Sequence, residues 1–345
     1  MAAQALSSVA DNALLIAAIA LIVELSGPDW MAPLMKWWFA LAYVVLAAFV
    51  GAFADAFPKG RVMFITNGIK VLGCLLMFGV HQLAQHQDSQ LFLVFFAYTL
   101  VGIGAAAYSP AKYGIVTEML KPELLVKGNS WIEGLTVLSI ILGTVLGGVL
   151  IHPDISPVLR NAPVIQDMAL SHTETAILII GFIYLAAAAC NLLIPKTNII
   201  YPKQKTNPIE LVKTFKGYVV ILWGDKLGQI SLAVTTLFWG AGATLQFIVI
   251  EWGAHQLGYR LDQSSILKQA LKVLPMGVIM GLTVLLMPFV KSTWAVYSLL
   301  LLIGATSGFF VVPMNALLQH RGHVLLSAGH SIAVQNFNQQ LNILF

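Results

Sequence analysis

The sequence predicts an all-α, polytopic membrane protein. Hydrophobic residues make up 58% of the 345 residues and charged residues only 10%, whereas about a quarter of the residues in soluble domains are charged. Apolar runs of about 20 residues recur along the chain, and each is long enough to cross a hydrocarbon core of about 30 Å. The formal net charge of +4 comes from lysines in short polar loops, so it does not indicate a nucleic-acid partner.

Six membrane spans are predicted in the first half of the chain. They cover residues 3–25, 36–57, 62–81, 91–108, 129–151 and 174–194. The loops after the second, fourth and sixth spans hold most of the lysine and arginine residues of this half, so the positive-inside rule places these loops and the amino terminus in the cytoplasm. The first run has no signal-peptide cleavage site, and we expect it to be a retained span that is preceded by a further segment.

The fourth span ends in a run of small residues that is followed by Ser109, Pro110 and Lys112. A proline disfavours helical conformation in the residue before it, so we expect the helix to break at this point. Lys112 would then lie where the apolar span meets water. It is either an interfacial anchor or a cation placed to meet an anionic head group.

The connection between the two halves, residues 195–228, is long and basic. Apolar residues recur in it at roughly helical spacing: Ile209, Leu211, Val212, Phe215 and Val219. We interpret this pattern either as an amphipathic helix on the inner leaflet or as a solvated basic loop that sets the topology. In both cases the chain divides into an amino-terminal six-helix bundle (1–194), a cytoplasmic linker (195–228) and a carboxyl-terminal bundle (229–345).

The second half contains fewer spans than the charge pattern requires. Spans are predicted at 229–252, 273–290 and 294–318, and a further one begins near residue 327. If these spans simply alternate, then Lys268, Lys272 and Arg321 fall on the outer side, against the positive-inside rule. One additional span between Asp262 and Lys268 would restore the rule.

Three ionisable residues lie well inside the spans, namely Asp11, Lys70 and Glu133. Each costs roughly 2.5–3.5 kcal/mol or more at the bilayer centre, so each is expected to face a partner or a wet cavity. They are candidates for a functional site, and the alternative is an internal ion pair that holds helices together. Asn12 follows Asp11 directly and can extend a polar network around it.

The turn between the second and third spans carries a separate set of candidates. It runs from Gly51 to Arg61 and contains Asp55 at a helix end, a tight turn at Pro58 and Gly60, and two cations. This composition suits a cytoplasmic latch in which salt bridges form and break as helices move. We assign Gly51, Asp55, Gly60 and Arg61 to this predicted latch.

Catalytic and metal-binding motifs find little support in the sequence. Cys74 and Cys190 both lie inside apolar runs, where two thiols without His or carboxylate neighbours form neither a disulfide framework nor a metal site. The pair Gly102 and Gly104 lacks the preceding strand and the later glycine of a nucleotide-binding loop. We therefore expect no enzyme, no cofactor and no metal.

Several segments together resemble a known family. The turn from Gly51 to Arg61 resembles the signature between helices two and three of the major facilitator superfamily, whose two bundles and linker fit the predicted spans. A longer series of segments, in order and over nearly the whole chain, resembles the bacterial lysophospholipid transporters. These segments are Asp11-Asn12-Ala-Leu-Leu, Gly60-Arg61-Val-Met, Gly104 to Gly114, Phe238-Trp239-Gly240-Ala-Gly242, Gly308 to Gln319 and Ala333-Val-Gln335-Asn336.

The resemblance implies a multi-pass transporter of the bacterial inner membrane that flips lysophospholipids, chiefly lysophosphatidylethanolamine, to the cytoplasmic leaflet. There an acyltransferase–acyl-carrier-protein synthetase would reacylate them, and the transporter would act as a monomer. Asp11, Lys112 and Glu133 coincide with polar positions of the family, and a carboxylate and a cation suit the ammonium and phosphate of the head group. The implied substrate-binding set also contains Asn12, Lys70, Tyr113 and Gln246.

The chain departs from the family at points that affect this site. Gln246 stands on the seventh helix where a basic residue is expected, which leaves Lys112 or Lys70 as the phosphate partner. Helix eight is expected to be missing around Ser264 to Leu267, and the chain is expected to end within helix eleven. The carboxyl-terminal bundle is therefore predicted to be incomplete.

Two other functions are compatible with these features. The first is a transporter of the same fold that carries another amphipathic or small substrate, because a fold does not fix the cargo. The second is a membrane partner that docks an acyltransferase through the linker without transporting anything. Charged residues inside the spans favour transport, because a docking scaffold gains little from them.

Overall fold

The computed structural model describes residues 1–240 and 315–344, apart from residues 29, 122–123, 161–169, 196, 198, 200, 202–206, 238, 316, 320 and 323. Six long apolar helices in this part of the chain are able to cross a membrane. They are α1 (Ala2–Glu24), α2 (Met31–Ala56), α3 (Lys59–Phe78), α5 (Gln87–Met119), α6 (Leu125–Leu150) and α8 (His172–Leu192). The all-α fold and the six spans predicted for the first half are confirmed.

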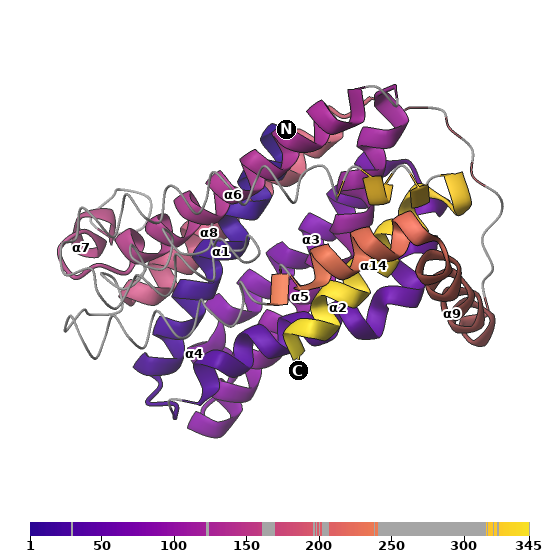
Figure 1. Ribbon diagram of the computed structural model, residues 1–345. Helices are drawn as coiled ribbons and strands as arrows, with labels where there is room; N and C mark the ends of the chain where they lie inside the picture. Colours follow the sequence, from indigo (N-terminus) through magenta and orange to yellow (C-terminus); the bar gives the residue numbers. More distant parts are fainter. Residues whose placement is uncertain are drawn as a thin grey trace, which may run out of the picture.

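The other described helices connect or accompany these spans. Short helices α4 (Val80–Leu83) and α7 (Ser156–Arg160) lie in the connections, α9 (Pro208–Gly224) lies in the linker, and α14 (Ala328–Leu344) ends the chain. Residues 226–237 are also helical. Figure 1 shows α14 running beside α2 and α5, which agrees with the contacts between these helices.

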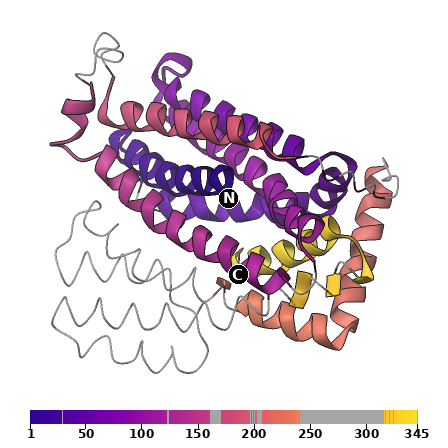
Figure 2. The same cartoon turned by 90° about the horizontal axis from the view of Figure 1, so that it is seen from above.

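The amino-terminal bundle is built around α1. This helix packs against α6 and α8, and α3 packs against α5 and α8, as the view in Figure 2 shows from above. Gly143 and Gly147 of α6 lie directly against the backbone of α1, because residues without large side chains let two helices approach closely in lipid. An apolar core that includes Leu14, Met77 and Ile177 fills the space between these helices.

Helix α5 does not break at Ser109-Pro110, so the prediction of a helix end there was wrong. The helix continues through Pro110 to Met119. A proline inside a helix removes one backbone hydrogen bond, but packing of the helix against its neighbours can hold a helix together through such a position in a membrane. Here α5 packs against α2 and α3. Lys112 therefore lies inside the helix, about two turns before its end, and not at an interface.

The linker contains the predicted helix, but with a different buried face. Asn207 caps α9 by accepting a hydrogen bond from the backbone N–H of Ile209 at 3.0 Å. Phe215 and Leu222 are buried in a cluster with Ala47 and Val50 of α2, whereas Ile209 is 68% exposed. The helix therefore packs on the end of α2 through the side that carries Phe215, and the side that carries Ile209 faces outward.

An ion pair relates the linker to the segment before α14. The guanidinium of Arg321 donates to both carboxylate oxygens of Asp225, which follows α9 directly. Arg321 therefore lies on the same side of the membrane as the linker, as the positive-inside rule requires. We call this side the cytoplasmic side. The predicted spans 273–290 and 294–318 and the missing span near residues 264–267 lie wholly or almost wholly outside the described residues.

Candidate functional site

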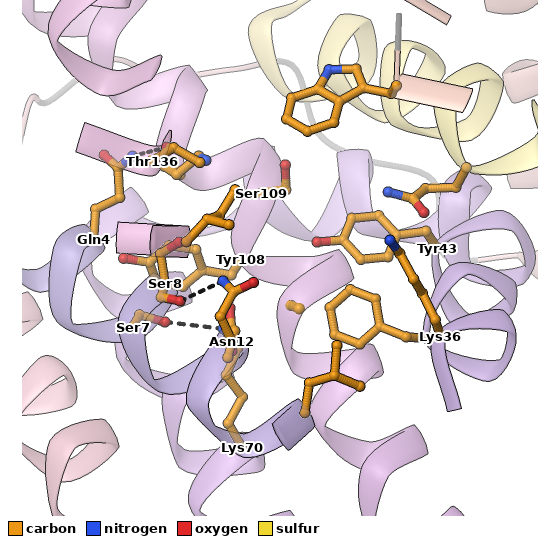
Figure 3. A pocket seen from close by; sticks show the side chains of 18 of the residues that line it. Gln4, Ser7, Ser8, Asn12, Lys36, Tyr43, Lys70, Tyr108, Ser109 and Thr136 are labelled. Carbon is orange, nitrogen blue, oxygen red and sulfur yellow. Dashed lines mark hydrogen bonds and ion pairs between the residues drawn. The ribbon is translucent and has the colours of Figure 1, made fainter. Parts of the chain in front are cut away.

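A cavity of about 270 Å³ lies where α1, α2, α3, α5 and α6 meet the carboxyl-terminal helix α14 (Figure 3). Four of the residues predicted from the sequence line it, namely Asp11, Asn12, Lys70 and Lys112. Tyr113 and Glu133 do not belong to its lining, and Gln246 lies outside the described residues. The cavity thus brings four of the seven predicted substrate-binding residues together between the two halves of the chain.

Asp11 and Lys70 form an ion pair on the cavity wall. The ammonium of Lys70 lies 2.9 Å from each carboxylate oxygen of Asp11. The Lys70 side chain is only 1% exposed, and that of Asp11 is 21% exposed toward the cavity. The residues come from α1 and α3, so the pair joins these two helices and removes most of the net charge from this part of the wall.

Neighbouring polar groups complete the pair. Lys70 also donates to the hydroxyl of Ser7 at 3.0 Å, and this hydroxyl donates to Asn67 at 2.9 Å. The hydroxyl of Tyr184 donates to one Asp11 oxygen at 2.6 Å. The Lys70 ammonium also lies 5.0 Å from the centroid of the Tyr108 ring. Lys70 is therefore held by a carboxylate, a hydroxyl and an aromatic face, as a buried charge requires.

Asn12 plays a local part in the described structure. Its side-chain amide donates to the backbone oxygen of Ser8 at 2.8 Å, one turn earlier on α1. Both residues line the cavity, and Figure 3 shows Asn12 beside Ser7 and Ser8. Asn12 therefore presents a polar group to the cavity one position after Asp11.

Lys112 is a cation on the cavity wall that has no described carboxylate within ion-pair distance. Its ammonium lies 4.2 Å from the centroid of the Tyr113 ring. The side chain is partly buried and extends from α5. A cation that is removed from lipid and forms no ion pair with a described acidic group is suited to bind an anion that enters the cavity.

Glu133 lies in a separate polar network between the two halves. It accepts hydrogen bonds from the hydroxyl of Tyr113 and from the amide of Asn315, both at 2.9 Å. Asn315 in turn accepts from Gln335 of α14 at 2.7 Å. The structure thus places Tyr113 and Glu133 at a contact between α5, α6 and the carboxyl-terminal half, and not at the cavity.

One wall of the cavity is aromatic, and the sequence did not single it out. Phe39 and Tyr43 of α2 line the cavity together with Tyr98 of α5. The ring centroid of Phe39 lies 5.6 Å from the ring centroid of Tyr43 and 5.8 Å from that of Tyr98. Lys36 lines the cavity one turn before Phe39. Aromatic residues are frequent in membrane spans, so no sequence signal separates these from rings that face lipid.

The predicted latch contains a buried cluster around Asp55. Asp55 pairs with Lys59 at 2.7 Å and with the imidazole of His330 at 3.1 Å, and it accepts from the hydroxyl of Ser327 at 2.5 Å. Ser327 and His330 stand at the start of α14. The cluster therefore ties the cytoplasmic end of α2 to the cytoplasmic end of α14. Lys59, and not Arg61, is the cation of the pair.

The remaining latch residues differ in what they contact. Gly51 lies against Gly329 and His330, so close that a Cβ atom would stand 3.1 Å from the backbone of each. Gly60 packs against Asn191 and Ile194 at the end of α8. Arg61 is exposed. Gly51 is thus part of the seam between α2 and α14, whereas Gly60 belongs to a contact within the amino-terminal half.

A second group of contacts holds the start of the linker. Glu118, near the end of α5, lies 3.5 Å from the ammonium of Lys59. It accepts from the hydroxyls of Thr197 and Tyr201 at 2.5 and 3.0 Å. The ring of Tyr201 lies 4.6 Å from the Lys59 ammonium. Lys59 therefore connects the Asp55 cluster to the first residues of the linker.

Metal binding has no support in the part of the chain that the structure describes. Within those residues, no three His, Cys, Asp or Glu side chains gather in a way that could hold a metal ion. Asp11 is paired with Lys70, and Asp55 is paired with Lys59 and His330. The first of these ion pairs lies on the cavity wall and the second lies at the seam between α2 and α14.

Comparison with known families gives a match over nearly the whole chain. The family model described as the Major Facilitator Superfamily matches residues 1–344. The chain is 38% identical to the lysophospholipid transporter LplT of Serratia proteamaculans (strain 568), with 99% of this chain and 84% of that protein covered. It is also 38% identical to LplT of Pectobacterium carotovorum subsp. carotovorum (strain PC1), with 98% and 81% covered. The Serratia match spans 365 aligned positions against 345 residues in this chain, so at least 20 aligned positions have no residue here.

Solved structures share the fold at low sequence identity. The structure of a bacterial homologue of the iron transporter ferroportin in an outward-facing state has a TM-score of 0.64 and 13% identity, with 99% of this chain and 88% of that chain covered. The human organic anion transporter MFSD10 has a TM-score of 0.64 and 15% identity, with 99% and 90% covered. These similarities concern the arrangement of helices and not the substrate.

Proposed function

Because the chain belongs to the major facilitator superfamily, we infer that it is a multi-pass transporter of the bacterial inner membrane and that its cargo is lysophospholipid. The proteins to which it is 38% identical are lysophospholipid transporters. In the direction that we propose, the lipid moves from the outer to the cytoplasmic leaflet. Lysophosphatidylethanolamine is the principal expected substrate.

The observation that carries this proposal is the charged cavity between the two halves of the chain. Its described lining contains the Lys112 ammonium, which has no described carboxylate within ion-pair distance. A phosphate head group needs such a cation, whereas the acyl chain needs only an apolar path. A lysophospholipid has one acyl chain, so its head group can enter a protein cavity while the chain stays among apolar side chains or lipid.

The structure supports Lys112 over Lys70 as the partner of the phosphate. Lys70 is 1% exposed and is already bound to Asp11 and Ser7. A phosphate could reach it only by separating a buried ion pair, which costs several kcal/mol. Lys112 requires no such separation. We therefore place the phosphate at Lys112, and the Asp11–Lys70 pair becomes part of the wall beside it.

The contacts around Asp55 and Gly51 fit the role of a latch that we propose for them. They join the cytoplasmic ends of α2 and α14, which belong to different halves of the chain. A transporter that exposes its site to alternate sides must open such a seam when it releases cargo inward. Separation of Asp55 from His330 and Ser327 would accompany that step.

We further propose that the transported lipid is reacylated at the inner leaflet by an acyltransferase–acyl-carrier-protein synthetase and that the transporter works as a monomer. Both statements rest on the family resemblance. The chemistry is consistent, because a lysophospholipid that reaches the cytoplasmic leaflet offers a free hydroxyl to an acyl donor.

The test is transport by the purified full chain in liposomes. Labelled lysophosphatidylethanolamine is added to one leaflet, and its loss from that leaflet is followed against protein-free liposomes and against diacyl phosphatidylethanolamine. We expect protein-dependent movement of the lysophospholipid only. Equal movement of the diacyl lipid would contradict the proposed substrate class, and movement of neither lipid would contradict the function.

A further inference from the structure

The ammonium of an ethanolamine head group needs a partner in the cavity, and Asp11 is poorly placed to provide it. Both Asp11 oxygens accept hydrogen bonds from Lys70, and one also accepts from Tyr184. A substrate ammonium would have to displace Lys70 from this carboxylate. Lys70 would then remain as an uncompensated buried cation, which is strongly unfavourable.

The aromatic wall offers a different kind of partner. Lys36, Phe39 and Tyr43 are spaced by three and four residues on α2, so they project from one face of the helix, and all three line the cavity. Phe39 and Tyr43 are only partly buried. Their ring centroids lie 5.6 Å apart, so the two rings form one continuous aromatic surface.

Tyr43 lies on the opposite side of the cavity from residues that neighbour the ion pair. Figure 3 shows Tyr43 and Lys36 on one side and Ser7, Asn12 and Tyr108 on the other. The Tyr108 and Tyr184 rings are already occupied, because the Lys70 ammonium lies 5.0 and 5.5 Å from their centroids. The protein thus already uses aromatic faces to hold one ammonium in this region.

We propose that Phe39 and Tyr43 bind the head-group ammonium through their ring faces when an ethanolamine lysophospholipid enters the cavity. The negative face of an aromatic ring attracts a cation, and the attraction strengthens when water is excluded. The phosphate lies at Lys112, which lines the same cavity from α5. This inference rests on the proposed function and adds the residues that read the head group.

The experiment compares two lysophospholipids in liposomes that contain the full chain. Lysophosphatidylethanolamine carries an ammonium, whereas lysophosphatidylglycerol carries the same phosphate and no ammonium. We expect Tyr43→Leu and Phe39→Leu each to reduce the transport of lysophosphatidylethanolamine about tenfold relative to that of lysophosphatidylglycerol. Tyr43→Phe keeps the ring and is expected to retain the wild-type ratio.

The glycerol lipid also reports on folding, because a variant that transports it has an intact path. If Tyr43→Leu does not yield folded protein, Phe39→Leu provides the same comparison. Equal losses for both lipids, or no loss for either, would overturn the inference, as would a Tyr43→Phe variant that behaves like Tyr43→Leu. A wild-type protein that moves neither lipid would instead overturn the proposed function.

Discussion

The Lys70 ammonium is bound by both carboxylate oxygens of Asp11 at 2.9 Å, although the two residues are 59 positions apart in the chain. This pair fixes α1 to α3 beside the cavity. It also neutralises both charges, since either charge alone would be costly in an apolar environment. The effect of removing either residue therefore depends on what happens to the other.

The Asp11→Asn variant is expected to lose stability, because Lys70 is left buried without a counter-charge. The free-energy loss for breaking such a pair is about 3–5 kcal/mol. The double variant Asp11→Asn/Lys70→Met, which removes both charges, is expected to regain most of it. Thermal unfolding in detergent, followed by size-exclusion chromatography, measures both changes.

Transport by the same two variants separates a structural role of Asp11 from direct substrate contact. If the carboxylate only balances Lys70, the double variant transports lysophosphatidylethanolamine nearly as well as the wild type. A well-folded Asp11→Asn protein with no transport would show instead that this carboxylate contacts the substrate.

The Lys112→Ala variant is expected to fold normally and to reduce transport at least about tenfold, because a charge-assisted hydrogen bond to phosphate is worth roughly 1.5–3 kcal/mol. Initial rates in liposomes provide the measurement. Lys127→Ala is the matched control, since Lys127 is an exposed cytoplasmic lysine. Normal transport by Lys112→Ala would contradict the proposed binding of phosphate by Lys112 and would indicate a structural role.

The Gly51→Val variant is expected to hold the seam between α2 and α14 open. A side chain at this position would meet the backbone of Gly329 and His330 at 3.1 Å, where neither helix can yield without moving. Spin labels at the exposed positions Phe57 and Val324 should report a longer distance than in the wild type. Gly68→Val is the control, because nothing lies within 4 Å of a Cβ at Gly68. An unchanged distance in Gly51→Val would show that the seam adapts.

The contact between Asp225 and Arg321 is expected to weaken only in acid. Hydrogen bonding from Arg321 and from the backbone of Gly228 lowers the pKa of Asp225. A carboxylate with a lowered pKa contributes its stabilisation above its unfolded pKa of about 3.9 and loses it as the pH falls through the lower folded value. Labels at Gly224 and Val324 should therefore keep a constant separation from pH 8 to 5 and move apart only when the pH falls below the unfolded value of about 3.9. The separation in Asp225→Asn should not change with pH, and a transition near neutrality in the wild type would contradict this account.

The position of Arg321 also makes the topology testable. A cysteine at Val324, which is 61% exposed, is expected to react with an impermeant reagent only from the cytoplasmic side. The chain between the linker and this residue must then cross the membrane an even number of times, which the predicted spans achieve only with one more crossing. Labelling from the periplasm would show that the predicted spans simply alternate.

Composition and residue spacing were sufficient to predict the six spans, because a helix in lipid needs a long apolar run and little else. The same cost of burying charge drew attention to Asp11, Lys70 and Glu133. Their partners could not be predicted, since Lys70 pairs with a residue on another helix and Glu133 with Asn315, 182 positions away. The roles given to these residues stay predictions.

Other features were missed for identifiable reasons. His330 stands 275 positions from Asp55, and one histidine in a polar stretch carries no sign of such a contact. The turn after α2 contains two cations, Lys59 and Arg61. Lys59 stands four positions after Asp55, and this spacing favours it as the partner of Asp55. The prediction at Pro110 failed because packing of α5 against α2 and α3 outweighs the local effect of the proline. The proposed domain boundaries at residues 195 and 229 also stay predictions.

Pro110 has a mechanical consequence for α5. The carbonyl of Ala106 has no backbone N–H four residues later, so the helix can bend at this turn without breaking any further hydrogen bond. Upstream of the turn, Gly104 lies against Thr66 and Lys70 of α3. Downstream, the Lys112 ammonium lies over the ring of Tyr113, and the Tyr113 hydroxyl donates to Glu133. The proline thus separates the half of α5 that packs against Thr66 and Lys70 from the half that carries Lys112, the residue to which we assign the phosphate. Bending at Pro110 would let the Lys112 ammonium move with a bound phosphate toward the cytoplasm, while the residues of α5 before Pro110 keep their place.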